Sequence, residues 1–181
     1  MGCLTLGGYT KGCEASHGGI EKIALFEKSE VDWTGKTEAN GIITALQLLS
    51  GSTGATYDFL KDNSNWVQTI VGDGILTSIH WTPTITLTFR RMSARLRTEI
   101  YNMSLGDLTA IIKDWNGIYW YIGGEKGLSL SASAGSSSGS KLEELNGEVI
   151  VINGMEPQPA YTIDISSGSS VDSRILALFG F

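Results

Sequence analysis

The sequence has little charge, few cysteines and no long apolar run. Charged residues make up 18% of the 181 positions, below the roughly 25% usual in soluble domains. The two cysteines, Cys3 and Cys13, are too few for a disulfide framework, and a cytosolic setting favours free thiols over a bridge between them. No stretch approaches the roughly 18 apolar residues of a membrane helix, and residues 1–19 lack the apolar core of a secretion signal. We therefore expect a soluble product without membrane insertion, which also disfavours an outer-membrane β-barrel.

The charge balance is acidic, with a formal net charge of −6 and a sequence pI of about 4.9. Non-specific nucleic-acid binding depends on Lys and Arg that neutralise phosphates, so an acidic chain argues against a DNA-clamping role. One basic cluster does exist, formed by Arg90, Arg91, Arg95 and Arg97. It could grip phosphate, but in an acidic protein we favour a solvated helix face that makes interface salt bridges.

The strongest secondary-structure signal is a β-strand over Leu76–Arg90. Apolar residues fall on odd positions such as Ile85 and Leu87, and threonines occupy the even positions 82–88. This period of two with β-branched residues is typical of a half-buried strand. Pro83 lies inside the run and cannot donate to a ladder, so an edge strand or a bend is expected there.

A hairpin is the second clear signal. Asp114-Trp115-Asn116-Gly117 separates the apolar runs Leu108–Lys113 and Ile118–Ile122, and Asn-Gly between such runs favours a tight turn. Ser29–Asn40 is polar and turn-like, while Ile42–Leu49 could be a strand or a short helix. Further strands are expected at Ile20–Phe26, Thr56–Lys61, Trp66–Val71, Leu128–Ala132, Glu148–Asn153 and Tyr161–Ile165.

One helix is predicted, over Ser93–Met103. Met92, Leu96, Ile100 and Met103 form a single apolar stripe at helical spacing, and Ser93 can cap the first turn. Arg174–Phe181 reads as an apolar tail that docks on a sheet. The expected fold is mainly β: an antiparallel β-sandwich or barrel with one flanking α-helix and extended arms or loops.

The expected organisation is one domain with an arm and a long loop. Residues 1–19 are Gly-rich and form a flexible or extended N-terminal arm, and residues 20–181 form a single β-rich domain. A Gly/Ser loop at 131–140 carries no reactive side chain. Ordering such a loop costs much conformational entropy, so we interpret it as a contact between subunits.

The sequence offers no catalytic constellation, no cofactor motif and no metal-ligand set. His17 and His80 each lack a second ligand at a suitable spacing, and the Asn102-Met103-Ser104 sequon is a chance match. We therefore expect no enzyme and assign no catalytic, cofactor-binding or metal residues. The carboxylates considered for a hydrolytic pair are Glu143 with Glu144, which look solvated, and Asp107 with Asp114, which flank one strand.

The order of several segments resembles a known family. The segments are NWVQTIVGDGILTSIHWTPTITLTFRRM, SARLRTEIYNM, KDWNGIYWYIG and NGEVIVINGMEP. Together they resemble the tail tube proteins of tailed bacteriophages. The resemblance implies a structural virion protein that assembles in the host cytoplasm into hexameric rings. These rings would stack into a hollow tube with other tail proteins, and genomic DNA would pass through without specific binding. Net acidity suits such a conduit, because it repels phosphate.

Two alternatives remain open. One is a different virion role, namely head decoration or head–tail joining. The other is a carbohydrate-binding β-sandwich that uses Trp115, Tyr119, Trp120 and Tyr121 as a sugar platform. The simpler interpretation of these aromatic residues is a hairpin core, in which strand alternation places Tyr119 and Tyr121 on one face and Trp120 on the other.

Overall fold

The computed structural model describes residues 16–61, 63–72, 79–131, 135–141, 143–166 and 169–181. The expectations for Cys3, Cys13 and most of the arm lie outside these residues. The helices are α1 (Ala94–Met103), α2 (Ser173–Phe179) and the 3-10 turn η1 (Lys28–Glu30). The strands are β1 (Ile20–Glu27), β2 (Val31–Ala39), β3 (Ile42–Leu48), β4 (Ala55–Asp58), β5 (Asn65–Val71), β6 (His80–Phe89), β7 (Leu108–Asp114), β8 (Tyr119–Ile122), β9 (Leu128–Leu130), β10 (Gly135–Ser137), β11 (Gly147–Gly154), β12 (Tyr161–Ile163) and β13 (Ser170–Val171).

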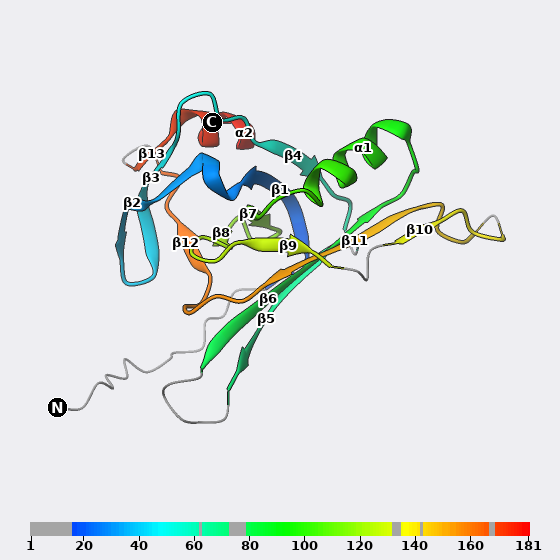
Figure 1. The fold of residues 1–181 in the computed structure, drawn as a ribbon, viewed down its shortest axis with the longest axis horizontal. Helices are drawn as coiled ribbons and strands as arrows, with labels where there is room; N and C mark the ends of the chain where they lie inside the picture. Colours follow the sequence, from blue (N-terminus) through cyan, green and yellow to red (C-terminus); the bar gives the residue numbers. More distant parts are fainter. Residues whose placement is uncertain (1–15, 62, 73–78, 132–134, 142, 167–168) are drawn as a thin grey trace.

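The prediction of a mainly β fold is confirmed, but the sheet is mixed and not antiparallel throughout. Its main path runs β13-β3-β12-β8-β7-β9-β11-β6-β5 within a 13-stranded sheet. Strand β3 pairs in parallel with β12 and β13, whereas β2 joins β3 in an antiparallel ladder. The described strands do not close on themselves. Long crossovers bring the C-terminal strands beside β3, and these non-local pairings cannot be read from periodicity (Figure 1).

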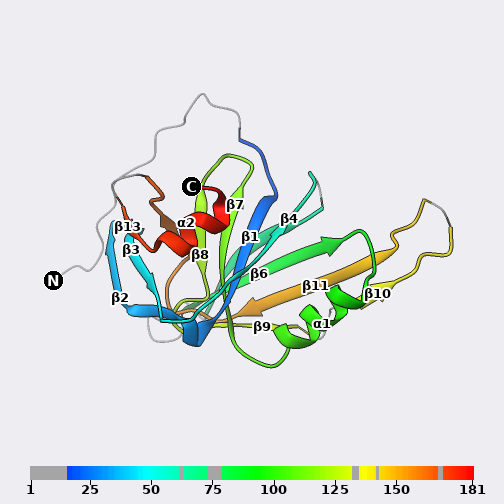
Figure 2. The same cartoon turned by 90° about the horizontal axis from the view of Figure 1, so that it is seen from above.

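Strands β1, β7 and β8 separate two hydrophobic cores. In β1, Ile23 and Leu25 face the first core, while Ala24 and Phe26 face the second. Strand β7 is buried on both faces. Its sequence is therefore a nearly continuous apolar run, which is typical of strands covered on both sides. The first core lies under β6, β9, β11 and α1, and the second under β2, β3, β12 and α2 (Figure 2).

The predicted helix is confirmed as α1. The Ser93 side chain accepts a hydrogen bond from the Leu96 N–H and caps the first turn, and Met103 and Ile100 pack on the first core. The expectation of a single helix is wrong, because the apolar tail contains the seven-residue helix α2. Asp172 caps it, and Ile175 is fully buried in the second core.

Two further expectations need correction. The turn-like segment Ser29–Asn40 contains the long strand β2, whose polar side chains face solvent while Trp33 stacks on Tyr121 with ring centroids 5.2 Å apart. Strand β6 is not an edge, because it pairs with both β5 and β11. The β6–β11 ladder instead stops at the Thr84–Asn153 pair, and pairing resumes only at the isolated bridge of Trp81 with Glu156. Pro83 lies between these two pairs, and because it has no N–H it interrupts the ladder there.

Candidate assembly surface

Four strands form a run that is open at both ends. They follow one another in the order β10-β11-β6-β5, every neighbouring pair being antiparallel. Strand β5 ends the sheet path, and β10 pairs only with β11 among the described strands. An open edge presents unpaired N–H and C=O groups and is a template for pairing with another chain. The edge that the sequence placed at Pro83 is therefore at β5.

The open edge of β5 is apolar. Val67, Ile70 and Val71 are exposed, Ile70 with 61% of its surface accessible. Trp81 on β6 exchanges both backbone hydrogen bonds with Glu156, away from β5. Along an antiparallel strand, the backbone N–H and C=O groups of successive residues point alternately to the two neighbouring strands. Odd positions of β6, such as Trp81, therefore bond away from β5, and the even positions of β6 bond to the odd positions of β5. The Ile70 N–H consequently points outward, toward the open edge.

Within the described strands, the outer face carries no Asp, Glu, Lys or Arg side chain, because the threonines of β6 alternate outward while Ile85 and Leu87 enter the first core. The only ionisable side chain on this face, within the described strands, is that of His80, which shares the face with the threonines of β6. On β6 and β11 the opposite face packs on the first core. The outer-face residues are Asn65, Val67, Thr69, Val71, His80, Thr82, Thr84, Thr86, Thr88, Gly135, Ser137, Gly147, Val149, Val151 and Asn153.

The Gly/Ser loop predicted at 131–140 is partly a strand, since β10 pairs with the start of β11 from Gly135↔Val149 to Ser137↔Gly147. The β10–β11 ribbon and the β5–β6 hairpin extend from the domain in opposite directions (Figure 1). Glu144, expected to be merely solvated, accepts hydrogen bonds from the Ser140 N–H and hydroxyl and from the Lys141 N–H. These bonds from Ser140 lower the pKa of the Glu144 carboxyl. These hydrogen bonds stabilise the connection between β10 and β11.

The arginine cluster divides between two roles. Arg97 on α1 reaches the buried Glu148 of β11, and its Nε lies 3.3 Å from the Glu148 Oε1. Arg90 donates a hydrogen bond to the side-chain oxygen Oδ1 of Asn63 at 2.9 Å. The first contact joins the helix to the β10–β11 ribbon. The favoured expectation of salt bridges between subunits stays a prediction, because the ion pair seen for Arg97 lies within the chain.

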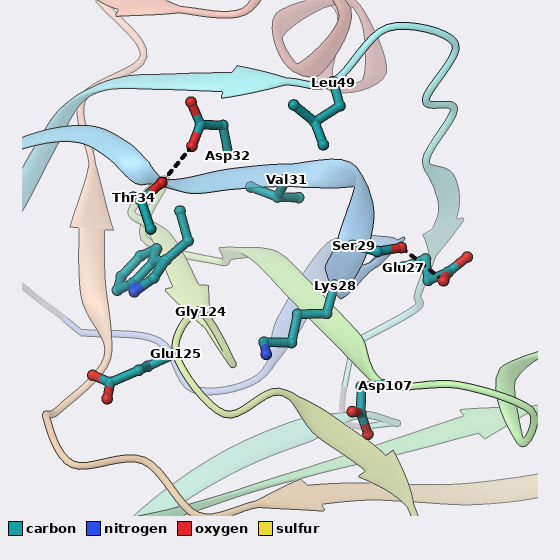
Figure 3. Close-up of a pocket in the computed structure, with 11 residues that line it drawn as sticks. Glu27, Lys28, Ser29, Val31, Asp32, Thr34, Leu49, Asp107, Gly124 and Glu125 are labelled. Carbon is teal, nitrogen blue, oxygen red and sulfur yellow. Dashed lines mark hydrogen bonds between the residues drawn. The ribbon is translucent and has the colours of Figure 1, made fainter.

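A separate cleft lies between the β1–β2 corner and the β8–β9 loop. It measures about 470 Å³, and Lys28, Asp107 and Glu125 line it. Figure 3 shows the Lys28 side chain extending toward the loop of Gly124 and Glu125, with Asp107 across the cleft. Asp32 and Glu27 are occupied by hydrogen bonds from Thr34 and Ser29. No group of three or more His, Cys, Asp or Glu suited to a metal ion occurs in the described part of the chain.

Three of the four aromatic side chains considered as a sugar platform, those of Tyr119, Trp120 and Tyr121, pack on the two cores. Tyr121 is 1% exposed and stacks on Trp33, while Trp120 faces the first core beside Trp66. Burial raises the pKa of the Tyr121 phenol. Tyr119 shares the face of Tyr121 and meets Phe179 of α2. The alternation predicted from the sequence is confirmed.

Asp114 and Asn116 form hydrogen bonds that stabilise the β7–β8 turn and attach His17 to it. Asp114 accepts from the Asn116 and Ile118 N–H groups and from the Trp120 indole. Asn116 exchanges two hydrogen bonds with the backbone of His17. Asp107 and Asp114 therefore sit at opposite ends of β7 without sharing a site.

Comparison of the chain with protein-family models, with curated proteins and with solved structures found no match. Within the described residues, no helix has the length and apolar character needed to cross a membrane.

Proposed function

We propose that this protein is a structural virion protein of a tailed bacteriophage. In this proposal it assembles into hexameric rings that stack into the tail tube, the conduit for DNA delivery. The observation that carries the proposal is the strand run β10-β11-β6-β5, which is open at both ends. The family-like segments fall on β5, β6 and β11 of this run, on helix α1 and on the β7–β8 hairpin. Its partners are further copies, other tail proteins and DNA that passes without specific binding.

The directions of the two edges suit a ring. Strand β10 is antiparallel to β11, and β5 is parallel to β11 because two antiparallel steps separate them. Copies related by rotation around a ring share one orientation, so β5 of one copy meets β10 of the next in antiparallel fashion. Such a contact is heterologous and closes only if the rotation does.

The bare face of the strand run would then line the channel. The rest of the domain packs against the opposite face of β6 and β11. In a closed ring such a bulky side fits on the outside, where the circumference is larger. DNA would meet threonine, valine and asparagine side chains instead of acidic ones. A neutral, hydroxyl-bearing wall binds phosphate weakly because it offers no Lys or Arg. The expectation that the net acidity of the ring repels phosphate stays a prediction.

The first test is negative-stain electron microscopy of the purified chain across a concentration series. Hollow tubes or stacked rings are expected. A monomer that persists at all concentrations would contradict self-assembly and favour a head-decoration or joining protein that needs a scaffold.

Ile70→Pro tests the β5 edge itself. Proline removes the outward N–H but no bond to β6, a position that edge strands tolerate. We expect this variant to fold and to lose assembly, whereas the matched control Ile70→Thr keeps the N–H and continues to assemble. Normal tubes from Ile70→Pro, with unchanged circular dichroism, would show that β5 does not pair with a neighbour.

A further inference from the structure

Strand β10 has no apolar side chain that could anchor it to the sheet by burial. It consists of Gly135, Ser136 and Ser137, all exposed, and none contributes an apolar side chain. Fixing Gly and Ser backbone costs conformational entropy that burial of large side chains normally offsets. A three-residue ladder at the end of a sheet therefore requires some other attachment.

Glu148 supplies a contact at this point. It continues the inward stripe of Ile150 and Ile152 on β11, and its side chain is only 5% exposed. A buried carboxylate is costly unless it is paired and hydrogen-bonded. Here the Ser136 hydroxyl donates to Oε2, and Arg97 of α1 donates to Oε1. Ser136 is also the residue directly opposite Glu148 in the ladder.

The ladder geometry strengthens this pairing. The Ser131 N–H donates to the Val151 carbonyl, which shows that odd positions of β11 bond to the β9 and β10 side. Glu148 and Ser136 thus form a non-hydrogen-bonded pair, in which facing side chains approach most closely. Gly147, next to it, leaves no room for a side chain, since a Cβ there would lie 1.9 Å from the Phe89 carbonyl oxygen. The base of the ribbon is therefore tight.

We infer that Glu148 is the positioning residue of β10: through Ser136 on one side and Arg97 on the other, it fastens the Gly/Ser strand to the sheet and couples it to helix α1. Resting on the proposed function, this makes Glu148 the group that sets the edge offered to the β5 strand of the next copy. The Gly/Ser composition then keeps the edge flat and free of large side chains, as a strand that receives a neighbour requires.

The test is hydrogen exchange by mass spectrometry on the full chain, diluted until it is monomeric. Ser136→Ala should lower the protection of the Gly135 and Ser137 amides, which bond to β11, about tenfold, the effect of losing one hydrogen bond to a charged group, while the β7–β8 hairpin keeps its protection. Ser136→Thr restores the hydroxyl and should restore protection. Ser138→Ala, outside the ladder, is the matched control and should change nothing. A Ser136→Ala/Ser137→Ala pair excludes a slipped register in which Ser137 takes over.

Two readouts separate this inference from the proposed function. Unchanged protection of the Gly135 and Ser137 amides in both Ser136→Ala and the double variant would overturn the role of Glu148, whether or not tubes form. If protection falls and the wild-type chain forms rings, Ser136→Ala should raise the concentration needed for rings about tenfold, with rescue by Ser136→Thr. Ring formation that ignores the loss of protection would overturn the link between β10 and the neighbour. Lost protection in a chain that never forms rings would support the positioning role and refute the tube.

Discussion

Replacing Asp172 by Asn should destabilise the fold through the loss of one ion pair. The Asp172 carboxylate accepts from the Arg174 Nε at 3.0 Å and from its terminal nitrogen at 2.7 Å, and also from the Leu48 N–H at 3.1 Å. Arg174 in turn donates to the carbonyls of Leu48 and Leu49. The pair thus ties the start of α2 to the end of β3, over the second core.

The magnitude follows from the pKa of Asp172. Hydrogen bonds from the Arg174 side chain are the main cause that lowers it from 3.8 to about 2. A shift of this size corresponds to about 2.4 kcal/mol, and because the Arg174 side chain is 40% exposed, solvent screening reduces the expected effect to about 1–2 kcal/mol. A depressed carboxyl pKa stabilises the fold fully above the unfolded value of 3.8, and this stabilisation is lost as pH falls through about 2.

Urea unfolding followed by tryptophan fluorescence measures this difference. Asn still caps a helix well, so Asp172→Asn removes the charge and keeps the cap. The variant should be less stable at pH 7, and the gap should shrink to about a third at pH 2.5. Asp58→Asn is the control, because the Asp58 side chain is 79% exposed and should change stability by less than about 0.5 kcal/mol. A gap that is absent at pH 7, or that does not shrink in acid, would refute the reasoning.

Three other substitutions test the packing. Gly124→Ala would place a Cβ 2.6 Å from Trp33 and Tyr121, so we expect a loss of about 1–3 kcal/mol in urea; no loss would mean that the stack moves freely. Ile175→Ala opens a cavity at a fully buried position and should cost about 2–5 kcal/mol, unless α2 is not docked in solution. Asp114→Ala removes the acceptor of four hydrogen bonds in the β7–β8 hairpin. We expect a loss of about 2–3 kcal/mol and faster amide exchange at Asn116 and Ile118; wild-type exchange would contradict the role of Asp114.

Local patterns predicted the elements whose signals are local. The alternation of β6, the Asn116-Gly117 turn and the capped stripe of α1 all follow from spacing and turn chemistry, and the structure confirms them. Strand β2 was missed because its exposed face is polar along most of its length. Helix α2 was missed because a seven-residue apolar segment carries no distinguishing period.

The candidate assembly surface could be located only from the pairing of strands that lie far apart in the chain. The sequence by itself determined a mainly β chain, three strands of the open run (β5, β6 and β11) and a net acidic charge. Only the tertiary structure decided that β5 and not β6 is the edge, that the outer face is uncharged, and that Glu148 meets Ser136 and Arg97. The physical reason is that pairing between strands far apart in the chain is selected by burial of both cores together, and no single segment carries that choice.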